Sequence, residues 1–177
     1  MKTYNIKEKI KKHFFMNPTK KMRVRQIERE LKLPLPSVIR YCKELEKEEI
    51  LKKETISGVS TYSADRASKK FLMVKRLFNI KSIFESGLLD YMIGEYFNPV
   101  IVLFGSYSRG EDIENSDIDL YVETPKKYEF NLQKFEKILS RKIQVFNYKS
   151  INDVPNSHLS NNIINGITIN NFLEAFS

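Results

Sequence analysis

A run of five apolar residues that ends at a glycine restricts the fold of this chain more than any other feature. The run, Val100–Phe104, follows Asn98 and Pro99, which stop a preceding helix, and its unbroken apolar character predicts a strand buried on both faces. Further along, Asp117 and Asp119 lie two residues apart in a second segment that is typical of a strand. Side chains two residues apart in a strand project from the same face. We therefore expect a sheet that carries a pair of carboxylates on one face.

Two neighbouring carboxylates repel each other unless a cation lies between or beside them. Asp117 and Asp119 are therefore candidate ligands of a divalent metal. Oxygen ligands favour Mg²⁺ or Mn²⁺ over zinc, and the chain has one cysteine, Cys42, and two histidines far apart, His13 and His158. This composition offers neither a disulfide within the chain nor a zinc cage, so Cys42 is interpreted as a packing residue.

The turn after the apolar run has the features of a phosphate site. Gly105 and Ser106 turn the chain sharply, which leaves backbone N–H groups and a hydroxyl available for phosphate oxygens. Arg109 adds positive charge close in sequence. A Gly-Ser pair or an Asp-x-Asp motif alone is most often part of a solvated loop or a strand end. The prediction therefore depends on their spacing, in which ten residues separate Ser106 from Asp117.

This spacing resembles the signature of the polymerase-beta-like nucleotidyltransferase superfamily, and more narrowly that of the minimal nucleotidyltransferases, from about Tyr91 to the end of the chain. The resemblance implies a mixed-sheet domain that uses Mg²⁺ or Mn²⁺ and an NTP, with ATP as the expected substrate. In that reaction a hydroxyl attacks the α-phosphorus and pyrophosphate leaves. By this resemblance the nucleotide-binding residues are Gly105, Ser106, Arg109 and Ser116, and the catalytic residues and ligands of two Mg²⁺ are Asp117 and Asp119.

The chain departs from the family pattern at the third carboxylate. That residue normally lies on a following strand, and here Gln144 stands where Asp or Glu is expected. An amide cannot accept a proton, and loss of a general base commonly lowers a rate by ~10²- to 10⁴-fold. Two functions remain open. Either the enzyme transfers AMP to a hydroxyl of a partner protein or a nucleic acid, with Glu123 or Asp153 as a replacement carboxylate if one is needed, or the domain binds nucleotide and metal within a transcriptional regulator.

The first third of the chain predicts a different domain. Between Met22 and Asp65 the pattern is that of two helices separated at Pro34 and Pro36, followed by two strand-like segments around a Ser-Gly pair whose glycine allows a positive φ. Two helices and a hairpin resemble a winged helix-turn-helix, with the match running from Leu31 to Tyr62. The positions expected to face the core of this domain are Val24, Ile27, Leu31, Val38, Cys42 and Leu45.

The winged helix resemblance implies a recognition helix whose first turn enters the DNA major groove. The charge agrees, because residues 1–70 contain 19 Lys+Arg and 9 Asp+Glu, whereas residues 71–177 contain 11 and 13. Duplex DNA is the expected partner. A protein-interaction module with a solvated basic surface is the alternative. Arg40 is the candidate for reading guanine, and the expected DNA-binding residues are Ser37, Arg40, Lys43, Lys52 and Lys53.

The predicted architecture is α+β, with an N-terminal winged helix-turn-helix plus a C-terminal mixed-sheet nucleotidyltransferase domain. Residues 1–66 are expected to form the DNA-binding domain and residues 98–177 the minimal nucleotidyltransferase domain. Residues 67–97 are expected to form a helical connector with interruptions near Asn79 and Gly87. The apolar side of this connector offers a contact for a homodimer.

The ends of the chain add two expectations. Apolar runs are far shorter than the ~20 residues of a membrane span, and the N-terminus lacks the apolar stretch of a signal peptide. We therefore expect a cytoplasmic protein without a membrane partner. Near the C-terminus, Ser157 is predicted to cap a helix that ends at Ile164 and is followed by an edge strand.

Overall fold

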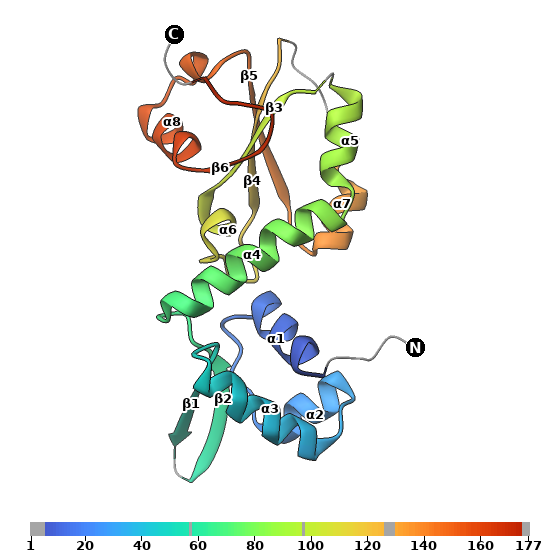
Figure 1. Cartoon of the computed structure of the whole chain (residues 1–177), viewed down its shortest axis with the longest axis vertical. Coiled ribbons are helices and arrows are strands. Elements are labelled where there is room, and N and C mark those ends of the chain that lie inside the picture. The colour runs from blue at the N-terminus through green and yellow to red at the C-terminus, as the bar shows by residue number, and fades with distance from the viewer. Residues whose placement is uncertain (1–5, 57, 97, 126–129, 175–177) are drawn as a thin grey trace. The chain divides into compact units, whose positions relative to one another are not determined.

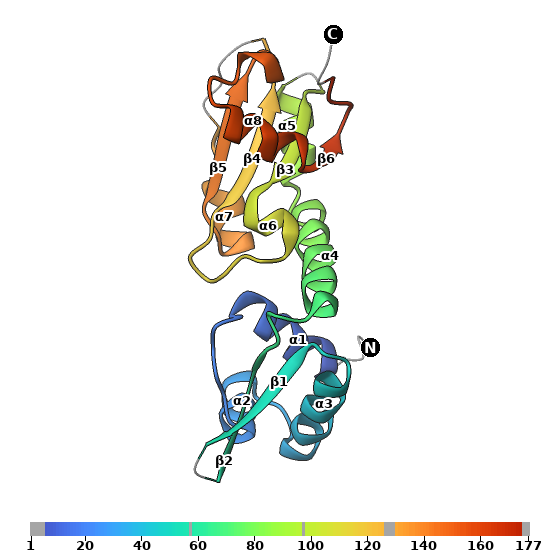
Figure 2. The same ribbon diagram turned by 90° about the vertical axis from the view of Figure 1, so that its left-hand side faces the viewer.

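The chain folds into two units, and the boundary between them falls inside one helix. The computed structural model describes residues 6–56, 58–96, 98–125 and 130–174 (Figures 1 and 2). Unit 1 extends from Met1 to Lys75 and unit 2 from Arg76 to Ser177. Helices with a β-hairpin come first and a mixed sheet follows, so the α+β class is confirmed. The predicted boundaries after residues 66 and 97 stay predictions.

The described part of unit 1 consists of three helices, a hairpin and the first part of the helix α4 (Lys69–Glu85), which the unit boundary divides. The side chains of Val38, Cys42 and Leu45, spaced three or four residues apart, are fully buried, as the helical periodicity predicted. Burial raises the pKa of the Cys42 thiol to about 12, which agrees with a packing role. The elements are α1 (Ile6–Met16), α2 (Val24–Leu31), α3 (Leu35–Lys47), β1 (Leu51–Ile56) and β2 (Val59–Ala64).

The hairpin closes over two residues, because Ile56 pairs directly with Val59. Gly58 has φ +76°, the left-handed conformation expected of a glycine at this turn. The preceding residue of the predicted turn, Ser57, lies outside the described residues. Met22, in the segment before α2, forms an isolated antiparallel bridge with Tyr62 of β2. The hairpin therefore gains a short third partner on the side of β2.

Unit 2 is built on a four-stranded mixed sheet in the order β5-β4-β3-β6. The β4 and β5 strands are parallel, whereas β3 is antiparallel to both β4 and β6. The predicted C-terminal edge strand is confirmed as β6. The elements are the rest of α4 (Lys69–Glu85), α5 (Leu88–Glu95), β3 (Val100–Phe104), α6 (Gly105–Arg109), β4 (Ile118–Glu123), α7 (Gln133–Leu139), β5 (Ile143–Tyr148), the 3₁₀ turn η1 (Ile151–Asp153), α8 (Ser157–Ile164) and β6 (Ile167–Asn170).

Each face of this sheet packs against a separate apolar cluster. One cluster combines α5 and α7 with alternate strand residues such as Leu103 and Leu120. The other combines η1 and α8 with the residues between them, such as Phe104 and Tyr121. Figure 1 shows α5 and α7 on one side of the sheet and α8 on the other. All five residues of β3 are buried, which confirms the prediction of a strand covered on both faces.

Three local expectations need correction. The α4 helix continues through Asn79, because this side chain bonds to other segments of unit 2 and does not compete for its own backbone. The cap of α8 is Asn156, whose Oδ1 accepts hydrogen bonds from two backbone N–H groups, so Ser157 is the first helical residue. Asp117 lies immediately before β4, and only Asp119 is in the strand. The break at Gly87 is confirmed, at φ +75°.

Among the described helices, none combines the length and the hydropathy that crossing a membrane would demand.

Candidate functional site

Asp119 occupies the second position of β4, in the interior of the sheet. Phe104 of β3 lies opposite it on one side, and Gln144 of β5 lies in register with it on the other. Alternation along β4 places Asp119 on the same face as Tyr121, which packs in the cluster of α8. The Asp119 side chain is half-buried, and Gln144 is exposed. The residue that replaces the expected third carboxylate is therefore beside Asp119 in the sheet.

Gly105 follows β3 directly and lies against the Asp119 carboxylate. A Cβ atom at position 105 would collide with Oδ2 of Asp119 and would lie 3.0 Å from its Cγ. Gly105 also has φ +71°, a conformation that L residues rarely adopt. Glycine is required here both by the backbone and by the carboxylate. The predicted phosphate turn and the predicted carboxylate are thus in contact.

The short helix α6 begins at Gly105. The N–H groups of a first helical turn have no partners within the helix, and Ser106 adds a half-buried hydroxyl. Arg109 is exposed at the other end of α6, where its Nε lies 2.7 Å from Oε2 of Glu111. These groups are donors of the kind that bind phosphate oxygens.

Charges at the site act on the Asp119 carboxyl. Its pKa is raised, first by burial, which disfavours the charged form, and then by the negative charge of Asp117. The positive charge of Arg109 acts in the opposite direction. The residues that influence the Asp119 pKa are therefore the neighbours that the sequence predicted for it.

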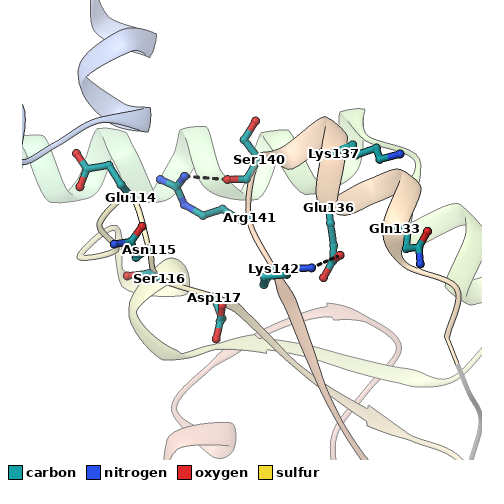
Figure 3. Close-up of a pocket in the computed structure, with 10 residues that line it drawn as sticks. All are labelled: Glu114, Asn115, Ser116, Asp117, Gln133, Glu136, Lys137, Ser140, Arg141 and Lys142. Carbon is teal, nitrogen blue, oxygen red and sulfur yellow. Dashed lines mark hydrogen bonds and ion pairs between the residues drawn. The ribbon is translucent and has the colours of Figure 1, made fainter.

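Asp117 is exposed and forms part of the wall of a pocket of about 620 Å³. Figure 3 shows residues 114–117 on one side of this pocket and residues of α7 and the following turn on the other. Ser116 lies beside Asp117, and its hydroxyl accepts a hydrogen bond from the backbone N–H of Ile113 at 2.9 Å. The residues that line the pocket are Glu114, Asn115, Ser116, Asp117, Gln133, Glu136, Lys137, Ser140, Arg141 and Lys142.

Sequence reasoning missed the side of this pocket that comes from α7 and the turn after it. Glu136 accepts hydrogen bonds from Lys142 Nζ and from the backbone N–H of Ile143, each at 3.1 Å. These bonds hold the turn between α7 and β5. The residues on that side of the pocket, from Gln133 to Lys142, are distant in sequence from Asp117, and no motif marks them. Only the fold brings them to the site.

The structure separates Glu123 from the aspartate pair. Glu123 is four residues along β4 from Asp119, a distance of about 13 Å at the rise of a strand. Its Oε2 accepts a hydrogen bond from Tyr121 Oη at 2.7 Å and another from the backbone N–H of Ile151 at 3.1 Å. Asp153 acts electrostatically on Tyr121, at this same end. Neither carboxylate is placed to replace the missing third one.

The donor set can be compared with what a divalent cation requires. Mg²⁺ prefers oxygen ligands and keeps several waters, so one or two carboxylates suffice when a phosphate supplies further oxygens. Asp117 and Asp119 fit this requirement, and the amide oxygen of Gln144 is a weaker ligand on the same face. The described part of the chain contains no group of three or more His, Cys, Asp or Glu side chains arranged to hold a metal. The site therefore fits a cation that is held by the two aspartates and takes further oxygen ligands from the phosphates of a nucleotide.

The candidate DNA-binding residues lie on α3 and β1 of unit 1. Arg40 is exposed, with its guanidinium 4.4 Å from the centroid of the Tyr41 ring and its Nε 3.8 Å from Oε1 of Glu44. Ser37 is half-buried in the first turn of α3, and Lys43 is exposed six residues later. All three predicted α3 contacts are thus accessible to different degrees.

Lys52 and Lys53 are both exposed on β1. As neighbours in a strand they project from opposite faces of the hairpin, and Lys52 Nζ lies 2.9 Å from Oε1 of Glu54. They are therefore suited to different phosphates and do not form a single pair.

Comparison with known proteins identifies the part of the chain that carries the aspartates. Residues 95–168 match the nucleotidyltransferase domain family. A protein of Methanocaldococcus jannaschii, named "Putative protein adenylyltransferase", is 42% identical over 60 residues, which cover 30% of this chain and 60% of that protein. The chain thus spans less than two thirds of the length of this curated relative. No solved structure gives a significant match. The part of the chain that contains Gly105, Asp117 and Asp119 thus resembles a nucleotidyltransferase domain.

Proposed function

We propose that this protein transfers a nucleoside monophosphate, AMP, from an NTP to a hydroxyl acceptor with Mg²⁺ or Mn²⁺, and that unit 1 binds nucleic acid. The observation that carries the first part is the packing of the Asp119 carboxylate against Gly105, with Asp117 beside it. This packing joins the phosphate turn to the carboxylates. The choice of an adenylyl group is supported by the name of the Methanocaldococcus jannaschii relative.

Each residue has a role in this proposal. The N–H groups at the start of α6 and the Ser106 hydroxyl bind phosphate oxygens, and Arg109 adds a positive charge to them. Asp117 and Asp119 hold the cation. When bound, Mg²⁺ neutralises charge that develops on the phosphates during the transfer. The remaining task of the protein is to hold the acceptor hydroxyl in line with the leaving pyrophosphate.

In this proposal Asp117 and Asp119 hold the cation, and β5 offers no third carboxylate beside Asp119 to receive the proton of the attacking hydroxyl. Gln144 occupies the neighbouring position, and its amide cannot act as a base. Solvent must then take the proton, which predicts a slow enzyme. The acceptor class is a protein or nucleic-acid hydroxyl.

Label transfer tests the activity directly. The full chain is incubated with Mg²⁺ and ATP labelled on the α-phosphate, together with candidate acceptors, and the same assay is run on the Asp117→Asn, Asp119→Asn double variant. Transfer that depends on Mg²⁺ and is lost in the variant supports the proposal. If the wild type transfers no label and binds no ATP, the proposal is wrong.

A second candidate function is supported by Gln144. In this alternative the domain binds nucleotide and metal without turnover, and the chain acts as a nucleotide-responsive regulator. Mg²⁺-dependent ATP binding that is lost in the double variant, without label transfer to any acceptor, would favour the regulator. An increase of transfer in Gln144→Glu would show that this residue is what limits the reaction.

For unit 1 we propose a winged helix that binds duplex DNA. The support is the order of elements, in which the Met22 bridge comes before α2, α3 and the hairpin, together with the excess of 19 Lys+Arg over 9 Asp+Glu in residues 1–70. The expected contacts are Ser37, Arg40, Lys43, Lys52 and Lys53.

Salt dependence tests this part of the proposal. Affinity for duplex DNA should fall steeply with salt concentration, because phosphate contacts release counterions. The Lys43→Ala variant should reduce the slope of the log–log plot by about one, since it removes one phosphate contact. A slope near zero for the wild type would contradict nucleic-acid binding.

A further inference from the structure

We propose that Asn79 of α4 is a positioning residue of the nucleotide site. It ties α6 to the loop that carries Asp117, and so sets the distance between the phosphate turn and the carboxylate pair. This inference rests on the proposed function of unit 2, because it assigns the residue a part in nucleotide binding.

The Asn79 side chain connects two segments through both hydrogens of its amide. Its Nδ2 donates to the carbonyl oxygen of Tyr107 at 2.9 Å and to Oδ1 of Asp112 at 2.7 Å. Asn79 is 1% exposed and Asp112 is 2% exposed. Tyr107 belongs to α6, which begins at Gly105. One buried amide therefore bridges α6 and the loop that follows it.

Asp112 extends this bridge to the turn before β5. Its Oδ2 lies 3.7 Å from Nη2 of Arg141, and Arg141 Nη1 donates to the carbonyl oxygen of Ser140 at 3.0 Å. Arg141 is 8% exposed and contributes to the wall of the pocket that Asp117 also lines. The Asp112 carboxylate thus contacts Asn79 of α4 with Oδ1 and Arg141, in the turn before β5, with Oδ2.

The loop is closed a second time just before Asp117. The Ile113 N–H donates to Ser116 Oγ, and the Ser116 N–H donates to the Ile113 carbonyl at 3.0 Å. Asp112 is anchored on one side of this turn, and β4 begins at Ile118 on the other side. The short segment that carries Asp117 is therefore held on both sides. A displacement of Asp112 would therefore be transmitted through this short loop to Asp117.

Asn79 is a buried polar residue beside the apolar cluster that α5 and α7 form on one face of the sheet. Ile83, one turn later on α4, belongs to the apolar cluster on that face of the sheet. A buried amide is costly unless its hydrogen bonds are made, whereas an apolar side chain of the same size packs without this requirement. Two satisfied bonds to two segments specify a geometry, which is the property that a positioning residue needs.

The test compares Asn79→Leu with Ile83→Ala in the full chain. Both remove something buried from α4, but only Asn79→Leu removes the bridge. Thermal unfolding measures the loss of stability in each, and a fluorescent ATP analogue measures affinity at several Mg²⁺ concentrations. We expect Asn79→Leu to weaken Mg²⁺-dependent affinity about tenfold, and Ile83→Ala to change it less than threefold at a comparable loss of stability.

A second measurement separates positioning from general damage. If Asn79 acts through Asp117, its effect on the Mg²⁺ dependence should disappear when Asn79→Leu is combined with Asp117→Asn. Asp112→Asn, which preserves size, should act in the same direction as Asn79→Leu and supplies the answer if the leucine variant does not fold.

The outcomes distinguish this inference from the proposed function. No Mg²⁺-dependent ATP binding by the wild type would overturn both. Binding by the wild type, with equal affinities for Asn79→Leu, Asp112→Asn and Ile83→Ala, would overturn the positioning role alone. Additive effects of Asn79→Leu and Asp117→Asn would also overturn it.

Discussion

Two carboxylates on the same face of β4 have opposite surroundings. Glu123 accepts hydrogen bonds from Tyr121 Oη and from the Ile151 N–H, so its charge is compensated within the fold. Asp119 receives no hydrogen bond from the described residues, and burial and Asp117 raise its pKa. A satisfied carboxylate stabilises the fold, whereas one kept with an elevated pKa is available for a ligand. Residue type therefore distinguishes these positions less well than their environment does.

The largest expected effect separates the two positions by function. Asp119→Asn removes a cation ligand, and the loss of several kcal/mol of charge stabilisation corresponds to a decrease of about 10³-fold in label transfer. Glu123→Gln should leave transfer within about threefold, because it is remote from the aspartate pair. Steady-state label transfer by both variants checks this contrast, and a comparable loss in the two would remove the distinction between them.

A gain is expected where the family pattern is broken. Gln144→Glu places a carboxylate in register with Asp119, and general bases commonly contribute ~10²- to 10⁴-fold. We expect transfer to increase about 10²-fold. Gln144→Leu is the control, since it removes the amide without adding a base. No increase in the glutamate variant would mean that proton removal does not limit the rate.

Replacement of Gly105 tests the contact with Asp119. Gly105→Ala forces a left-handed residue to carry a Cβ, which costs about 1–2 kcal/mol, and it also displaces the carboxylate. The thermal unfolding temperature and the affinity for ATP should both fall. Gly58→Ala is a matched control, because Gly58 has φ +76° and its added Cβ would meet no atom within 4 Å. Equal losses of ATP affinity in the two variants would contradict a role for the Asp119 contact.

A smaller effect is expected at the other end of the strand. Tyr121→Phe removes a hydrogen bond to the charged Glu123, so the free energy of unfolding should fall by about 1–2 kcal/mol. Denaturant unfolding measures the change, and ATP affinity should stay the same. A change in ATP affinity would show that the two ends of β4 are coupled.

The pH dependence of stability should differ in sign from that of an ordinary salt-bridged carboxylate. Because the folded pKa of Asp119 lies above its ordinary value of 3.8, the folded state binds the proton more tightly. The stability that proton binding to Asp119 contributes is therefore lost as the pH rises through the folded-state pKa of this residue. Without metal, Asp119→Asn should unfold at a higher temperature than the wild type at pH 7, and the difference should shrink toward pH 4. Thermal unfolding in chelator checks this.

Sequence patterns predicted the elements whose signals are local. The buried strand at residues 100–104 and the helix that buries Val38 and Cys42 follow from periodicity. Spacing singled out Gly105 and Asp119, which the fold brings into contact, and their role in a nucleotide site stays a prediction. The cap of α8 was misplaced by one residue, since Asn156 and Ser157 are both good caps and only the backbone decides between them.

The polar network around Asp112 could not be predicted in the same way. Its members come from α4, the loop after α6 and the turn before β5, and no local pattern relates them. The sequence pattern predicts a helix break near Asn79, because asparagine side chains usually favour helix ends and turns. This prediction is wrong because the Asn79 side chain bonds to segments that are distant in sequence. Contacts between segments distant in sequence are set by the fold.

The alternation of β4 between two apolar clusters limits how this domain can change during evolution. Inserting one residue between Ile118 and Asp119, or deleting Ile118, would turn the carboxylate toward the packing side of α5 and α7 and place an apolar residue at its former position. Such a change in length would cost both the fold and the chemistry at once. Variation in length should therefore accumulate in the connections beyond the strand, whereas within it relatives of this protein should differ only by substitution.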